Sequence, residues 1–201
     1  MTTITELSQL DPNGHYSYAD YLSWSLNETI ELIKGKISLM SPAPSLDHQR
    51  VSWQLNGLLF EYFRKKPCRA FAAPFDVRLY DRRKSVAANQ DIYTVVQPDL
   101  CVIRDVEKLD PRGCLGAPDW IIEILSKGNS KKEIQTKFEL YRESGVKEYW
   151  IVYPFEQAVH QFVLDEEQDQ YRLLAMFAGE DTASPHMFPD CMVDLQEVFA
   201  E

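Results

Sequence analysis

One carboxylate of this sequence stands where an apolar side chain is expected. Glu123 lies in the run 120–125, whose other five members are apolar, and such an unbroken run is typical of a strand that is buried on both faces. An ionised carboxylate in such a place costs several kcal/mol unless a cation, a metal ion or a shared proton compensates its charge. The alternatives are an exposed strand end or pairing with a core arginine. We therefore take Glu123 as the centre of a candidate site.

A second carboxylate precedes it near the head of another apolar run. Asp99 lies near the start of residues 97–104. If the two runs form neighbouring strands, Asp99 and Glu123 lie within reach of one ion, and oxygen ligands of this kind suit Mg²⁺ or Mn²⁺. The backbone carbonyl of Ile124 is a further candidate ligand. Asp119 is a rival partner, but it lies four residues before Glu123 on the same strand, about 13 Å away at the rise of a strand.

Lys137 is the third candidate. It belongs to a predicted helix, one turn after Ile134 and one turn before Tyr141, on the shoulder of the face that packs inward. Helix geometry alone allows a second interpretation, in which Lys137 forms a solvated i,i+4 pair with Glu133. The order of the elements favours the first interpretation, because a helix that follows the Glu123 strand can pack against it and direct a lysine to the same site.

Two long helices must position these groups. Residues 46–65 carry apolar side chains at the spacing of one helical face, and a proline soon follows. The helix over 131–144 is predicted to begin at a capping box of Ser130 and Glu133, and Gly145 is a natural stop.

The remaining segments are shorter. A helix is predicted over 16–26 and a hairpin over 31–37, with its turn at Lys34 and Gly35. Buried or alternating runs predict strands over 69–80, 97–104, 118–126, 148–153, 158–164 and 170–177, and a last segment over 192–199. This order of helices and strands predicts an α/β sandwich around a mixed sheet.

Composition bounds the class of protein. The 201 residues suit one domain, and we expect an arm over 1–15, a domain over 16–201 with its core at about 28–155, and C-terminal strands over 156–201. A hydrophobic share of 45% supports a sizeable core. No apolar run approaches the roughly 20 residues of a membrane span. The start is not signal-like and the cysteines show no paired spacing, so we expect a reduced, cytoplasmic protein.

The charge balance argues against a broad nucleic-acid-binding surface. The formal net charge is -10 and the pI is about 4.9, whereas nucleic-acid affinity rests largely on neutralising phosphates. Positive charge is concentrated only at 64–66 with Arg69, and at 82–84. Both stretches are typical of solvated loops or helix ends, although a local basic channel stays open.

An ordered set of motifs in this chain resembles a known family. The set comprises Glu31-Leu32-Ile33-x-Gly35, a Ser-Pro segment leading to His48, Gln97-Pro98-Asp99, Gly116-Ala117-Pro118-Asp119, Glu123-Ile124-Leu125-Ser126, Lys137-x-x-x-Tyr141 and Gly145-Val146-x-Glu148-Tyr149-Trp150. Together these motifs resemble the PD-(D/E)XK nuclease superfamily, and more closely the bacterial family described as "putative restriction endonucleases". The resemblance covers about residues 20–155.

The resemblance implies a fold, a function and site residues. It implies a restriction endonuclease-like α/β sandwich, with a central mixed β-sheet flanked by helices. It also implies a Mg²⁺- or Mn²⁺-dependent endonuclease that hydrolyses phosphodiester bonds, with DNA as the expected partner. Asp99 and Glu123 would hold the metal ion. The superfamily's lysine lies two residues after the glutamate, where this sequence has Leu125. In this family the following helix supplies the lysine instead, which corresponds here to Lys137.

Three further residues are candidate accessories. Glu31 matches an acidic position of the family that would complete the site, and an exposed hairpin charge is the other interpretation. His48 near a helix start could contact substrate, although a capping or otherwise satisfied histidine is the simpler interpretation. Tyr141 could hydrogen-bond behind Lys137, or be a core aromatic. The sequence departs from the family at Lys127, where a proline is common, and this changes the charge near the site mouth.

Two other classes of function stay open. One is a catalytically silent interaction or accessory module with the nuclease fold, which the acidic net charge favours and the intact Asp99, Glu123 and Lys137 oppose. The other is a metal-free glycosidase with two carboxylates, which predicts a cleft lined with exposed aromatics and leaves Lys137 without a role. A homodimer is expected only because most soluble oligomers are homo-oligomers.

Overall fold

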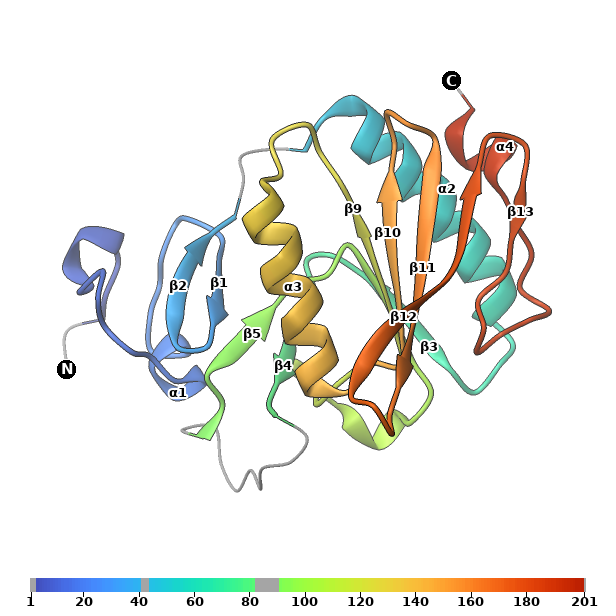
Figure 1. Ribbon diagram of the computed structural model, residues 1–201. Coiled ribbons are helices and arrows are strands. Elements are labelled where there is room, and N and C mark those ends of the chain that lie inside the picture. The colour runs from blue at the N-terminus through green and yellow to red at the C-terminus, as the bar shows by residue number, and fades with distance from the viewer. Residues whose placement is uncertain (1–2, 41–43, 82–90, 201) are drawn as a thin grey trace.

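The computed structural model describes residues 3–40, 44–81 and 91–200. Within these ranges the strands form two six-stranded mixed sheets and one two-stranded ribbon (Figure 1). The mixed sheets and their flanking helices confirm the predicted α/β class. The Ser-Pro segment at 41–42, the basic stretch 82–84 and the end of the loop at 89–90 lie outside the described residues.

The central sheet has the order β12-β11-β10-β9-β6-β3. Its strands are β3 (Arg69–Ala72), β6 (Leu100–Ile103), β9 (Trp120–Ile124), β10 (Glu148–Tyr153), β11 (Ala158–Asp165) and β12 (Gln170–Ala178). β9 and β10 run parallel, and the other neighbouring strands of this sheet run antiparallel. The β9–β10 pair is joined by a crossover helix, as parallel neighbours require.

The second sheet has the order β2-β1-β5-β4-β8-β7. Its strands are β1 (Ile30–Ile33), β2 (Lys36–Leu39), β4 (Val77–Leu79), β5 (Thr94–Val96), β7 (Leu109–Asp110) and β8 (Gly113–Leu115). The ribbon joins β13 (Thr182–Ala183) to β14 (Val193–Asp194). The helices are α1 (Tyr18–Tyr21), α2 (Leu46–Phe63), α3 (Lys131–Ser144) and α4 (Leu195–Phe199), with short 3-10 helices at Leu7–Gln9 and Val106–Lys108.

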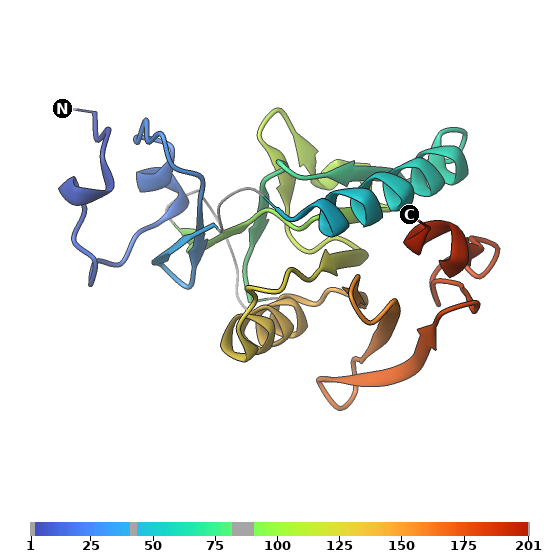
Figure 2. The same cartoon turned by 90° about the horizontal axis from the view of Figure 1, so that it is seen from above.

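The central sheet is covered on both faces. Trp120 and Ile122 of β9 belong to one core, which also holds Leu55 of α2 and the C-terminal segment. Ile121, which points the other way, belongs to a second core with Leu140 of α3 and strands of the second sheet. Figure 2 shows α2 and α3 on opposite sides of these strands. Burial on both faces explains why the β9 sequence is an apolar run without alternation.

Local sequence signals set the ends of the two long helices. The predicted capping box at the start of α3 is present, with both Ser130 and Glu133 bonded to backbone, and Gly145 ends the helix at φ 86°. α2 begins at Ser45, whose side chain accepts a hydrogen bond from the backbone N–H of His48. Both predicted helices are confirmed. No helix in the described part of the chain has the length and apolar character that a membrane crossing requires.

Two shorter predictions are corrected. The helix expected over 16–26 ends at Tyr21, because the chain turns there and Trp24 forms a bridge with Ile4. The strand expected over 69–80 is two strands, β3 and β4, which join different sheets. Pro74 between them has no N–H for a ladder. The sequence predicted no element over 91–96, where the structure has β5.

The hairpin at the start of the second sheet is confirmed. β1 and β2 pair in antiparallel register, with Ile33 opposite Lys36. Both turn residues have positive φ, 50° at Lys34 and 79° at Gly35. A two-residue turn with positive φ at both positions matches the right-handed twist of the strands that it joins. The hairpin places the buried Glu31 of β1 at a fixed position.

Candidate active site

The pairing of β6 with β9 brings the two predicted carboxylates together. Leu100 lies opposite Ile122 in this antiparallel ladder, so continuing the register by one residue sets Asp99 opposite Glu123. The backbone N–H of Ile124 donates to Asp99 Oδ2 at 2.7 Å. The prediction that the two runs are neighbouring strands is therefore confirmed.

Lys137 and Tyr141 reach the same carboxylate from α3. The Lys137 ammonium donates to Glu123 Oε1 at 2.9 Å and to Oε2 at 3.1 Å. The Tyr141 hydroxyl, one helical turn further along, donates a short hydrogen bond to Glu123 Oε1. Glu133 does not pair with Lys137, because its carboxylate accepts from the backbone N–H of Ser130 in the capping box. Of the two interpretations of Lys137, the inward one is observed.

Glu31 joins the cluster from the second sheet. Its side chain is only 6% exposed, and its Oε1 lies 3.4 Å from Lys137 Nζ. The same oxygen accepts a hydrogen bond from the backbone N–H of Gln97 at 2.9 Å. The amide of Gln97 in turn donates to Asp76 at 2.8 Å. Glu31 is thus a buried member of the site rather than an exposed hairpin charge.

Gln97 has a positioning role that the sequence did not reveal as such. Gln97 belongs to the motif Gln97-Pro98-Asp99, but the sequence assigned it no role of its own. Because its contact to Glu31 uses backbone atoms, no residue type could have signalled it.

His48 holds Asp99 from the first turn of α2. Its Nε2 lies 3.1 Å from Asp99 Oδ1, within ion-pair distance, whereas Asp99 Oδ2 accepts the hydrogen bond from the backbone of Ile124. The other ring nitrogen, Nδ1, is buried and has no hydrogen-bond partner within the described residues. The Nε2–H tautomer, with a bare acceptor at Nδ1, is the arrangement that fits these contacts.

The cluster shifts the protonation of its members. Burial raises the pKa of Glu123 to about 7, the neighbouring Asp99 and Glu31 act in the same direction, and Lys137 and the Tyr141 hydrogen bond oppose them. Burial acts to lower the pKa of Lys137, but the carboxylates of Glu123 and Glu31 outweigh it and keep that pKa above its ordinary value. Burial, reinforced by Glu123, places the pKa of Tyr141 well above its ordinary range, so the hydroxyl acts as a donor.

The carboxylate oxygens of Asp99 and Glu123 are suitable ligands for a hard cation. Asp99 Oδ2 accepts one hydrogen bond, from the Ile124 backbone, Asp99 Oδ1 lies 3.1 Å from His48 Nε2, and Glu123 Oε2 accepts from Lys137. Carboxylate oxygens of this kind are what Mg²⁺ and Mn²⁺ prefer. Within the described residues, however, no group of three or more histidine, cysteine or acidic side chains is arranged to hold an ion. The Lys137 ammonium neutralises the carboxylates instead.

Asp119 and the basic stretch near residue 65 lie apart from the site. The Asp119 carboxylate accepts from the backbone N–H of Arg104 at 2.8 Å, which fixes the start of β9. Arg64 pairs with Glu61, and Lys66 lies over the Tyr62 ring. These charges sit at the end of α2 opposite His48, roughly 25 Å away at the rise of a helix.

A second buried glutamate went unrecognised. Glu148, at the start of β10, is completely buried. Its carboxylate accepts from Trp150 Nε1 at 2.7 Å, Gln161 Nε2 at 2.8 Å, and the backbone N–H groups of His186 and Met187, both at 2.9 Å. The signal was present, because a glutamate next to an apolar run is the same pattern that pointed to Glu123.

The fold and the site together define a protein with a restriction endonuclease-like fold. A solved structure described as a putative nuclease belonging to DUF820, from Anabaena variabilis ATCC 29413, is similar over 92% of this chain and 98% of that chain, with a TM-score of 0.69. Its sequence is 19% identical, so the likeness concerns the fold alone. No curated protein sequence matches the chain.

The sequence comparison gives the family. The profile of Uma2, described as "Putative restriction endonuclease", matches residues 18–196. The chain therefore belongs to this family, as its motifs predicted.

Proposed function

We propose that this protein is a Mg²⁺-dependent endonuclease that hydrolyses phosphodiester bonds, with DNA as its substrate. The observation that carries the proposal is the contact of the Lys137 ammonium with both oxygens of Glu123, opposite Asp99. Two carboxylates and a lysine, drawn from two strands and a helix, form the constellation expected of a metal-dependent nuclease. Membership of the Uma2 family supports the nuclease class.

Asp99 and Glu123 are the residues that would hold the ion. The backbone carbonyl of Ile124 is a further candidate ligand, and Glu31 is close enough to Lys137 to share in balancing the charge. When bound, a divalent ion lowers the pKa of a water molecule and stabilises the charge that develops on a phosphate.

Lys137 and Tyr141 prepare Glu123 for this role. Tyr141 engages Oε1, which leaves Oε2 with the freer acceptor position. If a cation displaced the Lys137 ammonium from Glu123, the ammonium would still lie close to Glu31, from which it is 3.4 Å away. A fixed positive charge there stabilises a phosphate as its negative charge grows.

His48 acts through Asp99. Its imidazole and the Ile124 backbone hold the two oxygens of Asp99 in one orientation. Such supporting hydrogen bonds set the direction of a metal-binding carboxylate and contribute to metal affinity.

Local positive charge supports a polyanionic substrate in spite of the net charge of -10. Lys127, Lys131 and Lys132 are exposed, in the connection from β9 to α3 and in the first turn of that helix. Both α2 and α3 begin at the end of the central sheet that carries Glu123 (Figure 1). Lysines at such a position attract phosphates, and helix N-termini favour anions.

Cleavage assays test the proposal. Supercoiled plasmid and single-stranded DNA are incubated with the protein in Mg²⁺ or Mn²⁺, beside the Asp99→Ala and Glu123→Ala variants. We expect nicked and linear products, reduced on the order of 100-fold in either variant. Glu139→Gln is a matched control, because Glu139 lies on α3 but bonds Arg142 instead of the site. Equal cleavage by wild type and both alanine variants would overturn the site.

The silent-module alternative has its own outcome in the same assay. If the folded protein binds Mn²⁺ but cleaves neither DNA nor RNA, the chain is an accessory module that retains the fold. The glycosidase alternative is disfavoured by the structure, because it gives no role to a lysine bonded to both oxygens of Glu123.

A further inference from the structure

The outer face of α2 carries a row of large apolar side chains that nothing in the described chain covers. Leu46, Trp53 and Phe60 are 71%, 79% and 65% exposed. They follow one another at intervals of seven residues, so they lie along one side of the helix, one every two turns. The buried face of the same helix, with Leu55 and Leu59, packs in the central core. Such a contiguous exposed row marks an interaction surface.

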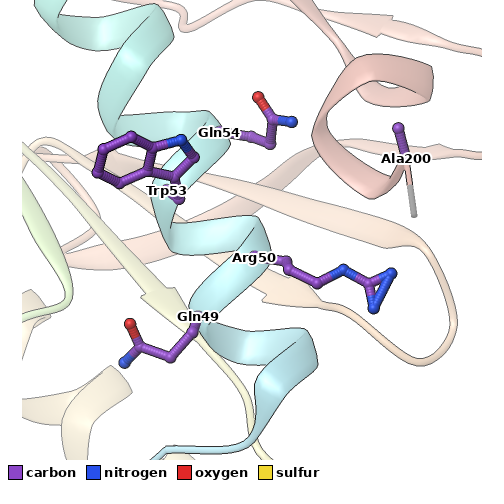
Figure 3. A pocket seen from close by; sticks show the side chains of 5 residues that line it. All are labelled: Gln49, Arg50, Trp53, Gln54 and Ala200. Atoms are coloured by element: carbon purple, nitrogen blue, oxygen red, sulfur yellow. The ribbon is translucent and has the colours of Figure 1, made fainter.

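The surroundings of Trp53 leave room for a partner. Figure 3 shows its indole on the α2 surface, beside a pocket lined by Gln49, Arg50, Trp53, Gln54 and Ala200. Gly57 lies one turn beyond Trp53, and a Cβ added to it would meet no atom within 4 Å. The surface is therefore low at Gly57 and projects at the exposed Trp53 beside it.

We propose that this face pairs two copies of the chain, with α2 packed antiparallel against α2 of the second copy around a twofold axis at the level of residue 55. Trp53 lies two residues before that level and Gly57 two residues after it. Reversal of the helix therefore sets each Trp53 ring over Gly57 of the second copy. A twofold contact needs a self-complementary surface, and this pair of residues provides one.

The charges along α2 match the same arrangement. Arg50 and Glu61 lie eleven residues apart, so they project on the same flank of the helix to within about 20°. Antiparallel helices bring like flanks together. With the axis at residue 55, Arg50 lies level with Glu61 of the second copy to within one residue, or about 1.5 Å. Two equivalent ion pairs then form, one on each side of the axis.

The present partners of these two charges leave them available. Arg50 lies 3.6 Å from Asp47, and Glu61 lies 3.4 Å from Arg64, both within the same helix. Asp47 and Glu61 are more than half exposed. Exposed pairs of this kind contribute little by themselves, so exchanging them for contacts between copies costs little.

The size of the row sets the strength of the contact. Aromatic side chains bury on the order of 150–250 Å² each, so Trp53 and Phe60 offer roughly 300 Å² per copy. The two aromatics of both copies therefore supply roughly 600 Å² of the about 1,200 Å² in total that marks the lower limit of specific interfaces, and Leu46 and the polar side chains around the row supply the rest. We expect a dimer that forms at micromolar concentrations, against the repulsion of two chains of charge -10.

Sedimentation equilibrium over roughly 1–100 μM tests the pairing. The wild-type average mass should rise from 23.3 kDa toward twice that value. Trp53→Glu should abolish the rise. Gly57→Gln should abolish it too, while raising the melting temperature, because it fills the hollow and replaces a helical glycine. Met176→Glu, at an equally exposed apolar residue of β12, should leave the dimer unchanged.

A charge exchange gives the sharper result. Arg50→Glu and Glu61→Arg should each raise the dissociation constant severalfold, and the double variant should return it to within about threefold of the wild type, since every ion pair is then reversed. A single-copy mass at all concentrations overturns the proposal. So does a dimer that persists in Trp53→Glu, one that Met176→Glu dissociates, or a double variant as weak as the single ones.

Discussion

Two buried glutamates lie on neighbouring parallel strands, and different kinds of protein groups compensate their negative charges. Glu148, on β10, accepts four hydrogen bonds, all from uncharged N–H groups. Glu123, on β9, accepts from an ammonium and a phenol and has two more carboxylates as electrostatic neighbours. A set of neutral donors satisfies a carboxylate completely and leaves it nothing to exchange. The donors to Glu123 include an ammonium that another cation can replace, so under the proposed function Glu123 can accept a metal ion.

The largest effect is expected at Glu148. A glutamine oxygen can keep the three donors to Oε1, but its N–H₂ group then stands at the position of Oε2 and faces the backbone N–H of Met187. A buried unsatisfied donor costs about 1–3 kcal/mol. We expect Glu148→Gln to lose on the order of 2–4 kcal/mol of unfolding free energy in urea, with Mn²⁺ affinity retained in the folded fraction. If its stability matched the wild type, the contrast between the two glutamates would be wrong.

The complementary change at Glu123 should spare stability and remove function. In Glu123→Gln, Lys137 keeps Glu31 at 3.4 Å, so we expect the loss of unfolding free energy to stay well below the about 3–5 kcal/mol that removing one partner of a buried ion pair typically costs. Mn²⁺ affinity, measured by titration calorimetry, should fall roughly 10- to 100-fold. A variant that bound Mn²⁺ as tightly as the wild type would remove Glu123 from the metal site.

Replacing Lys137 should change metal affinity and the rate of DNA cleavage in opposite directions. Its ammonium contacts both oxygens of Glu123, so a metal ion must compete with it. We expect Lys137→Gln to bind Mn²⁺ severalfold more tightly than the wild type while cleaving DNA far more slowly. Weaker Mn²⁺ binding in this variant would show that Lys137 builds the metal site rather than competes for it.

The stability of the metal-free protein should depend on pH through Glu123. Its pKa in the folded chain, about 7, lies above the ordinary value of 4.5, so the folded state binds the proton more tightly than the unfolded chain. This contribution to stability is complete below pH 4.5 and is lost as the pH rises through about 7. Urea unfolding at a series of pH values should show this fall in the wild type and a flatter profile in Glu123→Gln. Identical profiles would argue against the raised pKa.

The smallest effect is expected at His48, where the position of the donor matters. A glutamine amide reaches about where Nε2 lies, whereas an asparagine amide reaches only to Nδ1, which has no partner. We expect His48→Gln to keep Mn²⁺ affinity within about threefold and His48→Asn to lose about tenfold. Equal losses in the two variants, at equal melting temperature, would mean that the hydrogen bond to Asp99 is not what His48 contributes.

The sequence predicted the elements whose signals are local. The capping box at Ser130, the positive-φ turn at Lys34 and Gly35, and the unbroken apolar run of β9 each act within a few residues, and each is found where expected. The split of 69–80 into two strands depends on which sheet each half joins, and nothing in those residues states that.

The candidate site shows the same division. Asp99, Glu123 and Lys137 were found because a charge in an apolar setting is visible in the sequence, and the structure brings them together with Glu31, His48 and Tyr141. The difference between Glu123 and Glu148 was not visible. Three of the four donors to Glu148 come from positions 13 to 39 residues away in the chain, so only the folded structure shows that its carboxylate is fully hydrogen-bonded whereas that of Glu123 is not.

The ammonium of Lys137 has a further consequence for how the protein is used. Because it already balances charge in the carboxylate cluster, we expect the chain to fold without an ion, unlike small domains that unfold when a chelator removes their metal. Under the proposed function, Mg²⁺ would bind reversibly to a protein that is already folded, in exchange for the Lys137 ammonium. The concentration of free Mg²⁺ would then set the fraction of molecules that can cleave DNA. Removing Mg²⁺ would leave the protein folded but inactive.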